Sequence, residues 1–221
     1  MTQVGGLGPG HRPDEAARTA MERSNVYGFL AAVYRSEPTA ALLGRMKSPD
    51  FLDALGAAGV ALEQDLLGLP EAELLEKLAV EYTRLFIGPG SHIPPYSSVH
   101  LGGEGASLWG ASTAWVKRFI EAAGFEYRPD YHDLPDHVSV ALEFMQEITA
   151  REACALDEPD ADEAGRLLSI EEEFVREHLA AWLPGFCDNV VDQARLPFYG
   201  EMAKLTKAFV ESELESTTPL S

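Results

Sequence analysis

The stretch PEAELLEKLAVEYTRLFIGPGSHIPPYSSVH, residues 70–100, passes from a helical pattern into a loop of unusual composition. Apolar residues in its first half recur at spacings that place them on one helical face: Leu74, Leu78, Tyr82 and Leu85. The sequence Gly88-Pro89-Gly90 then breaks the helix, and the loop that follows holds two adjacent prolines, a tyrosine and a pair of serines. This stretch therefore predicts a helix that ends in a stiff, aromatic and hydroxyl-bearing loop.

The same helical periodicity continues along most of the chain. No segment has the alternation of apolar and polar residues that is typical of a half-buried strand. The predicted fold class is all-α, a single-domain helical bundle of about nine helices over residues 21–216. Residues 1–20, rich in glycine and proline, are predicted to be a disordered tail, and residues 217–221 a short C-terminal tail. The polar, turn-rich segment 127–134 is a candidate hinge between two helical halves.

Several helix boundaries are predicted from glycine, proline and capping residues. Asp133 is expected to cap a helix that continues to about residue 153. Pro184-Gly185 is expected to break the helix that precedes it. Gly124 is expected to stop a helix over residues 103–124. The core candidates of that helix are Leu108, Trp115, Phe119 and Ile120.

The charge of the chain restricts the partners that it can bind. It carries 36 acidic and 17 basic residues, a formal net charge of −19. Nucleic acid and anionic membrane surfaces are therefore poor partners, because both require clustered lysine and arginine. A cationic polypeptide segment would be attracted, although solubility alone also explains an acidic surface.

The two cysteines and the N-terminus indicate a cytoplasmic protein. Cys154 and Cys187 form no C-x-x-C motif and suggest reduced thiols rather than a disulfide framework. The first twenty residues have no apolar core of the kind found in a secretory signal, and no apolar run approaches the ~20 residues that span a bilayer. The sequence therefore predicts no stable membrane insertion.

Motifs of common enzyme classes are missing from the sequence. It has no Walker A loop, no G-x-S-x-G elbow and no H-E-x-x-H pair. One enzyme alternative is a metal-dependent HD-type phosphohydrolase, in which His132-Asp133 would bind a metal together with His100 and Asp192. Helix capping by Asp133 explains the same doublet without a metal. The favoured interpretation has no catalytic residue, no metal and no cofactor.

Three motifs in order along the chain resemble the TorD/DmsD/NarJ family of redox-enzyme maturation chaperones. The first is the loop stretch itself, with Tyr82, Leu85-Phe86, Pro89, Pro94-Pro95-Tyr96 and Ser98. The second is LPDHVSVALEFM, which contains Asp136 and His137. The third is HLAAWLPGFCDNVVDQARLPFYGEMAKLTKAF, residues 178–209. The resemblance extends from about residue 22 to residue 212.

This resemblance implies a cytoplasmic chaperone and not an enzyme. Such chaperones bind the twin-arginine signal peptide, or the apo catalytic subunit, of a molybdenum-cofactor oxidoreductase and assist cofactor insertion before export. The family includes monomers and homodimers, and the sequence does not name the client. The residues that the resemblance implies for peptide binding are Tyr82, Leu85, Phe86, Gly88, Pro89, Pro94, Pro95, Tyr96, Ser98, Asp136 and His137.

The chemistry of these residues suits a leader peptide, but each also has a structural explanation. An apolar groove with carboxylate acceptors at one end would match two arginines followed by an apolar stretch. Leu85 and Phe86 are adjacent, so one narrow helical stripe does not easily bury both. Asp136 and His137 would equally serve as a tie between the loop and the next helix. A plain helical scaffold or dimerisation module is the third alternative.

Overall fold

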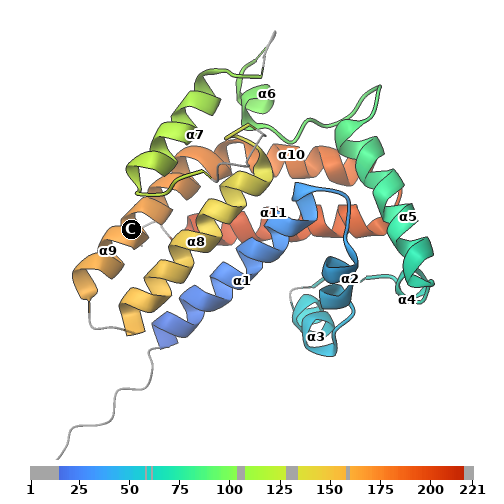
Figure 1. Cartoon of the computed structure of the whole chain (residues 1–221), viewed down its shortest axis with the longest axis horizontal. Coiled ribbons are helices and arrows are strands. Elements are labelled where there is room, and N and C mark those ends of the chain that lie inside the picture. The colour runs from blue at the N-terminus through green and yellow to red at the C-terminus, as the bar shows by residue number, and fades with distance from the viewer. Residues whose placement is uncertain are drawn as a thin grey trace, which may run out of the picture.

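The structure is a computed structural model that describes residues 15–57, 59–60, 62–103, 108–127, 134–157 and 160–216. The described residues form helices with no strand, which confirms the all-α prediction (Figure 1). The helices are α1 (Glu15–Arg35), α2 (Ala40–Met46), α3 (Pro49–Ala57), α4 (Gln64–Leu67), α5 (Glu71–Tyr82), α6 (Ser97–Leu101), α7 (Ala111–Ala122), α8 (Val138–Asp157), α9 (Ala161–Phe174), α10 (Ala180–Gln193) and α11 (Pro197–Ser216).

Two π-helical turns extend these segments into longer rods. The turn η1 (Thr83–Ile87) continues α5, and η2 (Val175–Leu179) joins α9 to α10. With each rod counted once, the described part of the chain contains ten helices, close to the predicted nine. None of the described helices is both long and apolar enough to cross a membrane.

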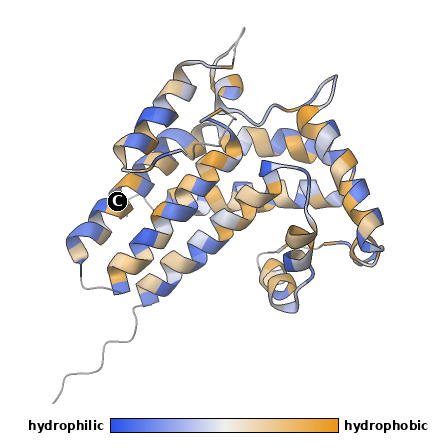
Figure 2. Cartoon of the chain, viewed as in Figure 1, coloured by the Kyte–Doolittle hydropathy of each residue, from blue (hydrophilic) through white to orange (hydrophobic). Residues whose placement is uncertain are grey.

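The long helices surround one apolar core. Helix α1 lies alongside α8, which packs on α9, while α10 and α11 form a second pair against them (Figure 1). The long helices carry both apolar and polar residues, as amphipathic helices do (Figure 2). Large aromatic side chains fill much of the space between them: Tyr27, Tyr34, Tyr199, Phe174, Phe186 and Phe198.

One guanidinium group joins four of these helices. Arg23 of α1 donates hydrogen bonds to Glu152 of α8 at 3.0 Å, to Glu171 of α9 at 2.7 Å and to Glu213 of α11 at 2.7 Å. Tyr27 donates a further bond to Glu213 at 2.9 Å. Burial, opposed by Arg23 and reinforced by the Glu152 charge, raises the pKa of Glu171 to about 8. Glu171 therefore holds its proton to a higher pH in the folded protein than in the unfolded chain.

The predicted ends of the domain differ in part from the structure. Helix α1 begins at Glu15, earlier than the predicted residue 21, and it buries Ala17 and Ala20 against the core. The remainder of the predicted tails, residues 1–14 and 217–221, and most of the predicted hinge at 127–134 lie outside the described residues.

Three predicted helix boundaries were wrong. Pro184 does not end a helix but lies within α10, five residues after the end of the η2 turn, and the rod continues through it. Helix α8 begins at Val138 and not at the predicted cap Asp133, which lies outside the described residues. Helix α7 begins only at Ala111, so the predicted core residue Leu108 precedes it and is 48% exposed.

Candidate functional site

The loop after η1 is bonded directly to the segment that begins α8. Val138 donates its backbone N–H to the Pro95 carbonyl at 2.8 Å, and Ser97 donates to the Asp136 carbonyl at 3.0 Å. Tyr96 and His137 form an isolated antiparallel bridge between these bonds. Two motifs that are about forty residues apart in the sequence therefore form one structural unit.

The Asp136 side chain caps the short helix α6. This carboxylate has no exposed surface, and its Oδ2 accepts a hydrogen bond from the Ser98 backbone N–H at 2.9 Å. The Ser97 hydroxyl lies 3.5 Å from the same oxygen. An orphan N–H at the start of a helix needs such an acceptor when it is buried. The contacts of Asp136 are thus those of a tie between the loop and α8.

His137 caps the next helix in a similar way. Its Nδ1 accepts the Ser139 backbone N–H at 3.1 Å and lies 2.8 Å from the Ser139 hydroxyl. Since an N–H donates to Nδ1, the neutral ring carries its proton on Nε2. The Tyr96 ring packs edge-on against the His137 ring, with 5.1 Å between centroids. His137 therefore fixes both the start of α8 and the position of Tyr96.

Tyr82, Leu85 and Phe86 belong mainly to the core. Their residues are 3%, 0% and 4% exposed, respectively. The Phe86 ring packs edge-on against the Tyr34 ring at 6.0 Å between centroids and stacks on the Phe186 ring at 6.1 Å. Leu85 and Phe86 are thus both buried, although their adjacency makes this difficult for one narrow helical stripe.

The π-helical turn η1 explains why both side chains turn inward. A turn of this kind adds a residue per turn and shifts the helical register, so it broadens the buried face. Gly88 closes the turn by donating to the Thr83 carbonyl at 2.6 Å, and a Cβ on Gly88 would lie 3.1 Å from that oxygen. The same register shift leaves Ile87 61% exposed.

A cavity of about 450 Å³, the Ile87 cavity, opens between α1, η1 and the start of α8. Five of the residues predicted for peptide binding line it: Tyr82, Phe86, Pro95, Tyr96 and His137. Sequence reasoning missed the other lining residues: Arg35, Ser36, Glu37 and Ile87. The remaining predicted residues are not among those that line it: Leu85, Gly88, Pro89, Pro94, Ser98 and Asp136.

Charged groups at the rim of the Ile87 cavity have partners on neighbouring elements. Arg35 forms an ion pair with Glu143 of α8. The exposed Glu37 carboxylate accepts a hydrogen bond from the Thr83 hydroxyl at 2.8 Å, which leaves further acceptor capacity on its oxygens. The cavity thus offers an apolar wall with a carboxylate at its edge.

Glu81 joins the turn η1 to the segment between α10 and α11. Its carboxylate accepts hydrogen bonds from Arg84 at 2.7 Å and from the Arg195 backbone N–H at 2.6 Å, and so holds the turn between α10 and α11. Burial alone would raise the pKa of Glu81, but the bonds from Arg84 and from the backbone lower it overall. Glu81 therefore has a structural role.

The residues proposed for the metal alternative are only partly described. His132 and Asp133 lie outside the described residues. His100 donates from Nε2 to the Pro94 carbonyl at 2.9 Å and stacks on Trp182. Across the described ranges, no group of three or more His, Cys, Asp or Glu side chains is placed to hold a metal ion.

The chain matches known proteins along most of its length. Residues 48–188 match the family model described as nitrate reductase delta subunit. Chaperone protein TorD from Shewanella loihica is 26% identical over 208 residues, which cover 88% of this chain and 92% of the relative. TorD from Vibrio vulnificus strain YJ016 is 25% identical over 202 residues, with coverages of 85% and 91%.

A solved structure has the same fold. The crystal structure of an Archaeoglobus fulgidus protein described as a redox enzyme maturation protein aligns with a TM-score of 0.54 and 21% identity, and covers 95% of this chain and 99% of that protein. The sequence relatives are named chaperones, in agreement with the prediction that the chain is not an enzyme. Because the family model covers more than half of the chain, the protein belongs to the nitrate reductase delta subunit family, which is the family of redox-enzyme maturation chaperones that its motifs resemble.

Proposed function

We propose that this protein is a cytoplasmic chaperone that binds the twin-arginine leader of a molybdenum-cofactor oxidoreductase, or its apo catalytic subunit, in the Ile87 cavity. The observation that carries the proposal is the cavity itself, since the first and second sequence motifs both contribute to its lining and an exposed isoleucine borders it. In this proposal the apolar stretch of the leader covers Ile87 and the Tyr96 ring. The single helical domain from α1 to α11 acts alone or as a homodimer.

Apolar burial supplies most of the proposed affinity. A micromolar complex needs about 8 kcal/mol. Full burial of one isoleucine contributes about 1.5–3 kcal/mol, whereas an exposed ion pair with Glu37 contributes only about 0.2–1 kcal/mol. The leader arginines would therefore contribute mainly to register and discrimination. Binding should accordingly change little between low and physiological salt.

The cavity is partly organised before the leader binds. Pro94 and Pro95 restrict the loop, and the bonds from Val138 and Ser97 fix it against α8. A preorganised wall lowers the ordering cost of association, which would otherwise reduce the affinity of a flexible leader. Holding the leader in this way would delay export of the client until its cofactor is inserted.

Titration calorimetry with a synthetic twin-arginine leader tests the proposal. Ile87→Asn should weaken binding at least tenfold, equivalent to about 1.4 kcal/mol, because it removes apolar contact area. Val80→Asn is the matched control, because Val80 is 65% exposed on the same rod and is not among the residues that line the cavity. Equal losses in both variants, or no binding by the unmodified protein, would contradict the proposal.

A further inference from the structure

The short helix α6 is tied to two other parts of the chain. The backbone N–H of Ser98 donates to Asp136 Oδ2 at 2.9 Å, which joins the first sequence motif to the second. The hydroxyls of Ser97 and Ser112 share a hydrogen bond of 2.6 Å, which joins α6 to α7. Ser97 and Ser98 are both buried. These bonds bring α6, α7 and the segment before α8 together at one point.

Aromatic side chains of the third motif complete the contacts around this point. The Trp182 ring of α10 stacks on the His100 ring of α6, with 5.4 Å between centroids. The His178 ring of η2 lies 6.1 Å from the Trp182 ring and stacks on the Trp115 ring of α7 at 5.5 Å. The Asp136 charge acts on the His178 ring as well. All three motifs therefore meet between α6, α7 and the rod formed by η2 and α10.

Four buried polar atoms at this meeting point have no hydrogen-bond partner among the described residues. They are Ser98 Oγ, Asp136 Oδ1, His178 Nε2 and Trp182 Nε1, named here the Asp136 cluster. Their residues are only 0–3% exposed. Most buried polar atoms are hydrogen-bonded, because an unsatisfied one loses its bonds to water on folding. Four such atoms in one place, contributed by all three motifs, are better explained together than one by one.

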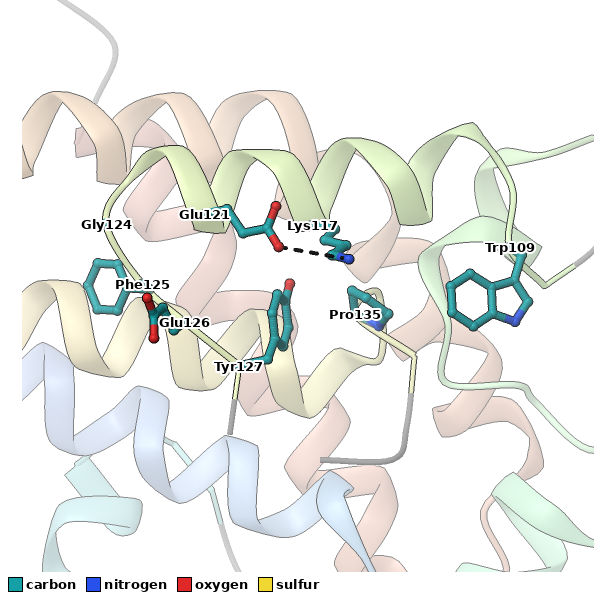
Figure 3. Close-up of a pocket in the computed structure, with 8 residues that line it drawn as sticks. All are labelled: Trp109, Lys117, Glu121, Gly124, Phe125, Glu126, Tyr127 and Pro135. Atoms are coloured by element: carbon teal, nitrogen blue, oxygen red, sulfur yellow. Dashed lines mark ion pairs between the residues drawn. The ribbon is translucent and has the colours of Figure 1, made fainter. Parts of the chain in front are cut away.

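Open space borders the Asp136 cluster on two sides. Figure 3 shows a cavity of about 670 Å³ along α7, and one of its lining residues is Pro135, which directly precedes Asp136. A second cavity, of about 540 Å³, has Ser112, Trp115 and His178 among its lining residues. A small molecule from solvent therefore has only a short way to travel to reach the cluster.

The chemistry of the Asp136 cluster selects water as its occupant. The Trp182 indole nitrogen can only donate, and an ionised Asp136 oxygen can only accept, whereas the Ser98 hydroxyl can do either. Burial lowers the pKa of His178 to about 4, although the Asp136 charge opposes this effect, so the ring is neutral at pH 7 and is not a counter-ion. The indole N–H disfavours a cation, and the carboxylate disfavours an anion. Water both donates and accepts, and buried water typically bonds about three otherwise unsatisfied groups.

We propose that the Asp136 cluster is a binding site for buried water, which joins Asp136 Oδ1 and the Ser98 hydroxyl to His178 and Trp182 of the third motif. Such a site satisfies the second oxygen of a carboxylate whose first oxygen caps α6. Through this water, the rod formed by η2 and α10 holds the loop that lines the Ile87 cavity. The inference goes beyond leader binding and does not depend on it.

Nuclear magnetic resonance of the protein alone tests this inference. The chain has three tryptophans, so the indole N–H signal of Trp182 can be resolved. It should show a nuclear Overhauser contact with water, of the sign that indicates water held for longer than the protein takes to tumble. Oxygen-17 relaxation dispersion, which reports only water, should show a buried population as well. This second measurement excludes proton exchange through the Ser98 hydroxyl as the source of the contact.

Two aromatic variants connect these signals to the Asp136 cluster. His178→Phe keeps an aromatic ring beside Trp182 but removes both ring nitrogens, so it should abolish the water contact of the indole and lower the dispersion amplitude. Trp115→Phe is the matched control, because its indole stacks on the same ring but is not among the buried groups that lack a partner, and both signals should persist. Ser98→Ala, a smaller change that removes one bond to the water, should weaken both signals.

The two proposals fail in different ways. Absence of a water contact at the Trp182 indole in the unmodified protein would overturn the inference. Signals that survive unchanged in both folded His178→Phe and Ser98→Ala would overturn it equally. Because these measurements include no leader, neither outcome affects leader binding at the Ile87 cavity. Ile87→Asn should weaken the leader but leave the water signals unchanged, since Ile87 is not part of the Asp136 cluster.

Discussion

Asp136→Ala should lower the free energy of unfolding by about 2 kcal/mol, because it removes the acceptor for a buried backbone amide. The Asp136 carboxylate is fully enclosed, and it accepts the Ser98 N–H at 2.9 Å across a separation of 38 residues. For a domain of this size, a loss of about 2 kcal/mol lowers the thermal midpoint by about 4–8 °C.

Asp136→Asn is the control for this prediction. Its amide oxygen can still accept the Ser98 N–H, so most of the stability should be retained. Thermal and urea unfolding followed by circular dichroism would measure both variants. A loss in Asp136→Asn as large as that in Asp136→Ala would show that the capping bond is not what stabilises the loop.

The same pair of variants separates a structural from a direct role in binding. If Asp136 acts through the loop, Asp136→Asn should bind the leader within about twofold of the unmodified protein, since each tenfold change requires about 1.4 kcal/mol. If its carboxylate instead pairs with a leader arginine, Asp136→Asn would bind weakly while remaining stable. That second outcome would refute the structural role argued from its burial.

Further predictions concern the core and its buried charges. Phe86→Ala should cost about 3–5 kcal/mol of stability in urea unfolding, because it empties a space between core aromatic rings, and a cost below 1 kcal/mol would mean that Phe86 is not a core residue. The folded protein binds the Glu171 proton more tightly than the unfolded chain, so the free energy of unfolding should fall as pH rises from about 4.5 to about 8, by at most about 1.4 kcal/mol per pH unit. Glu171→Gln should flatten this fall in urea unfolding at several pH values, and an unchanged slope would contradict the assignment. Arg23→Gln should destabilise the protein by about 3–5 kcal/mol because it leaves buried carboxylates without their counter-ion, and thermal unfolding would measure the loss.

The fold could be predicted from sequence wherever a helix is long enough to repeat its apolar spacing. Helices such as α5, α8 and α11 have several turns, and their buried residues recur at three- and four-residue intervals. Helices α2, α4 and α6 have only seven, four and five residues, too few for a period to be visible. The continuous rod through Pro184 was missed because a proline usually ends or kinks a helix, whereas α10 continues through it here.

Only part of the candidate site could be predicted, because its geometry depends on a π-helical turn and on contacts between segments that are distant in the sequence. The motifs predicted a loop whose residues the structure places at the Ile87 cavity, but they did not predict that Phe86 would be 4% exposed or that Ile87 would be 61% exposed, because both depend on the π-helical turn η1. The acceptor role of Asp136 depends on a hydrogen bond between distant segments, which no local pattern encodes.

Methyl nuclear magnetic resonance tests leader binding at the Ile87 cavity most directly. The chain has five isoleucines, and Ile87 is 61% exposed whereas Ile93, Ile120 and Ile148 are 0–4% exposed. With labelled isoleucine δ1-methyl groups, a bound leader should shift the Ile87 signal most and give nuclear Overhauser contacts between its apolar side chains and that methyl. A saturating leader that leaves the Ile87 signal in place, with contacts only to methyl groups elsewhere, would contradict the account.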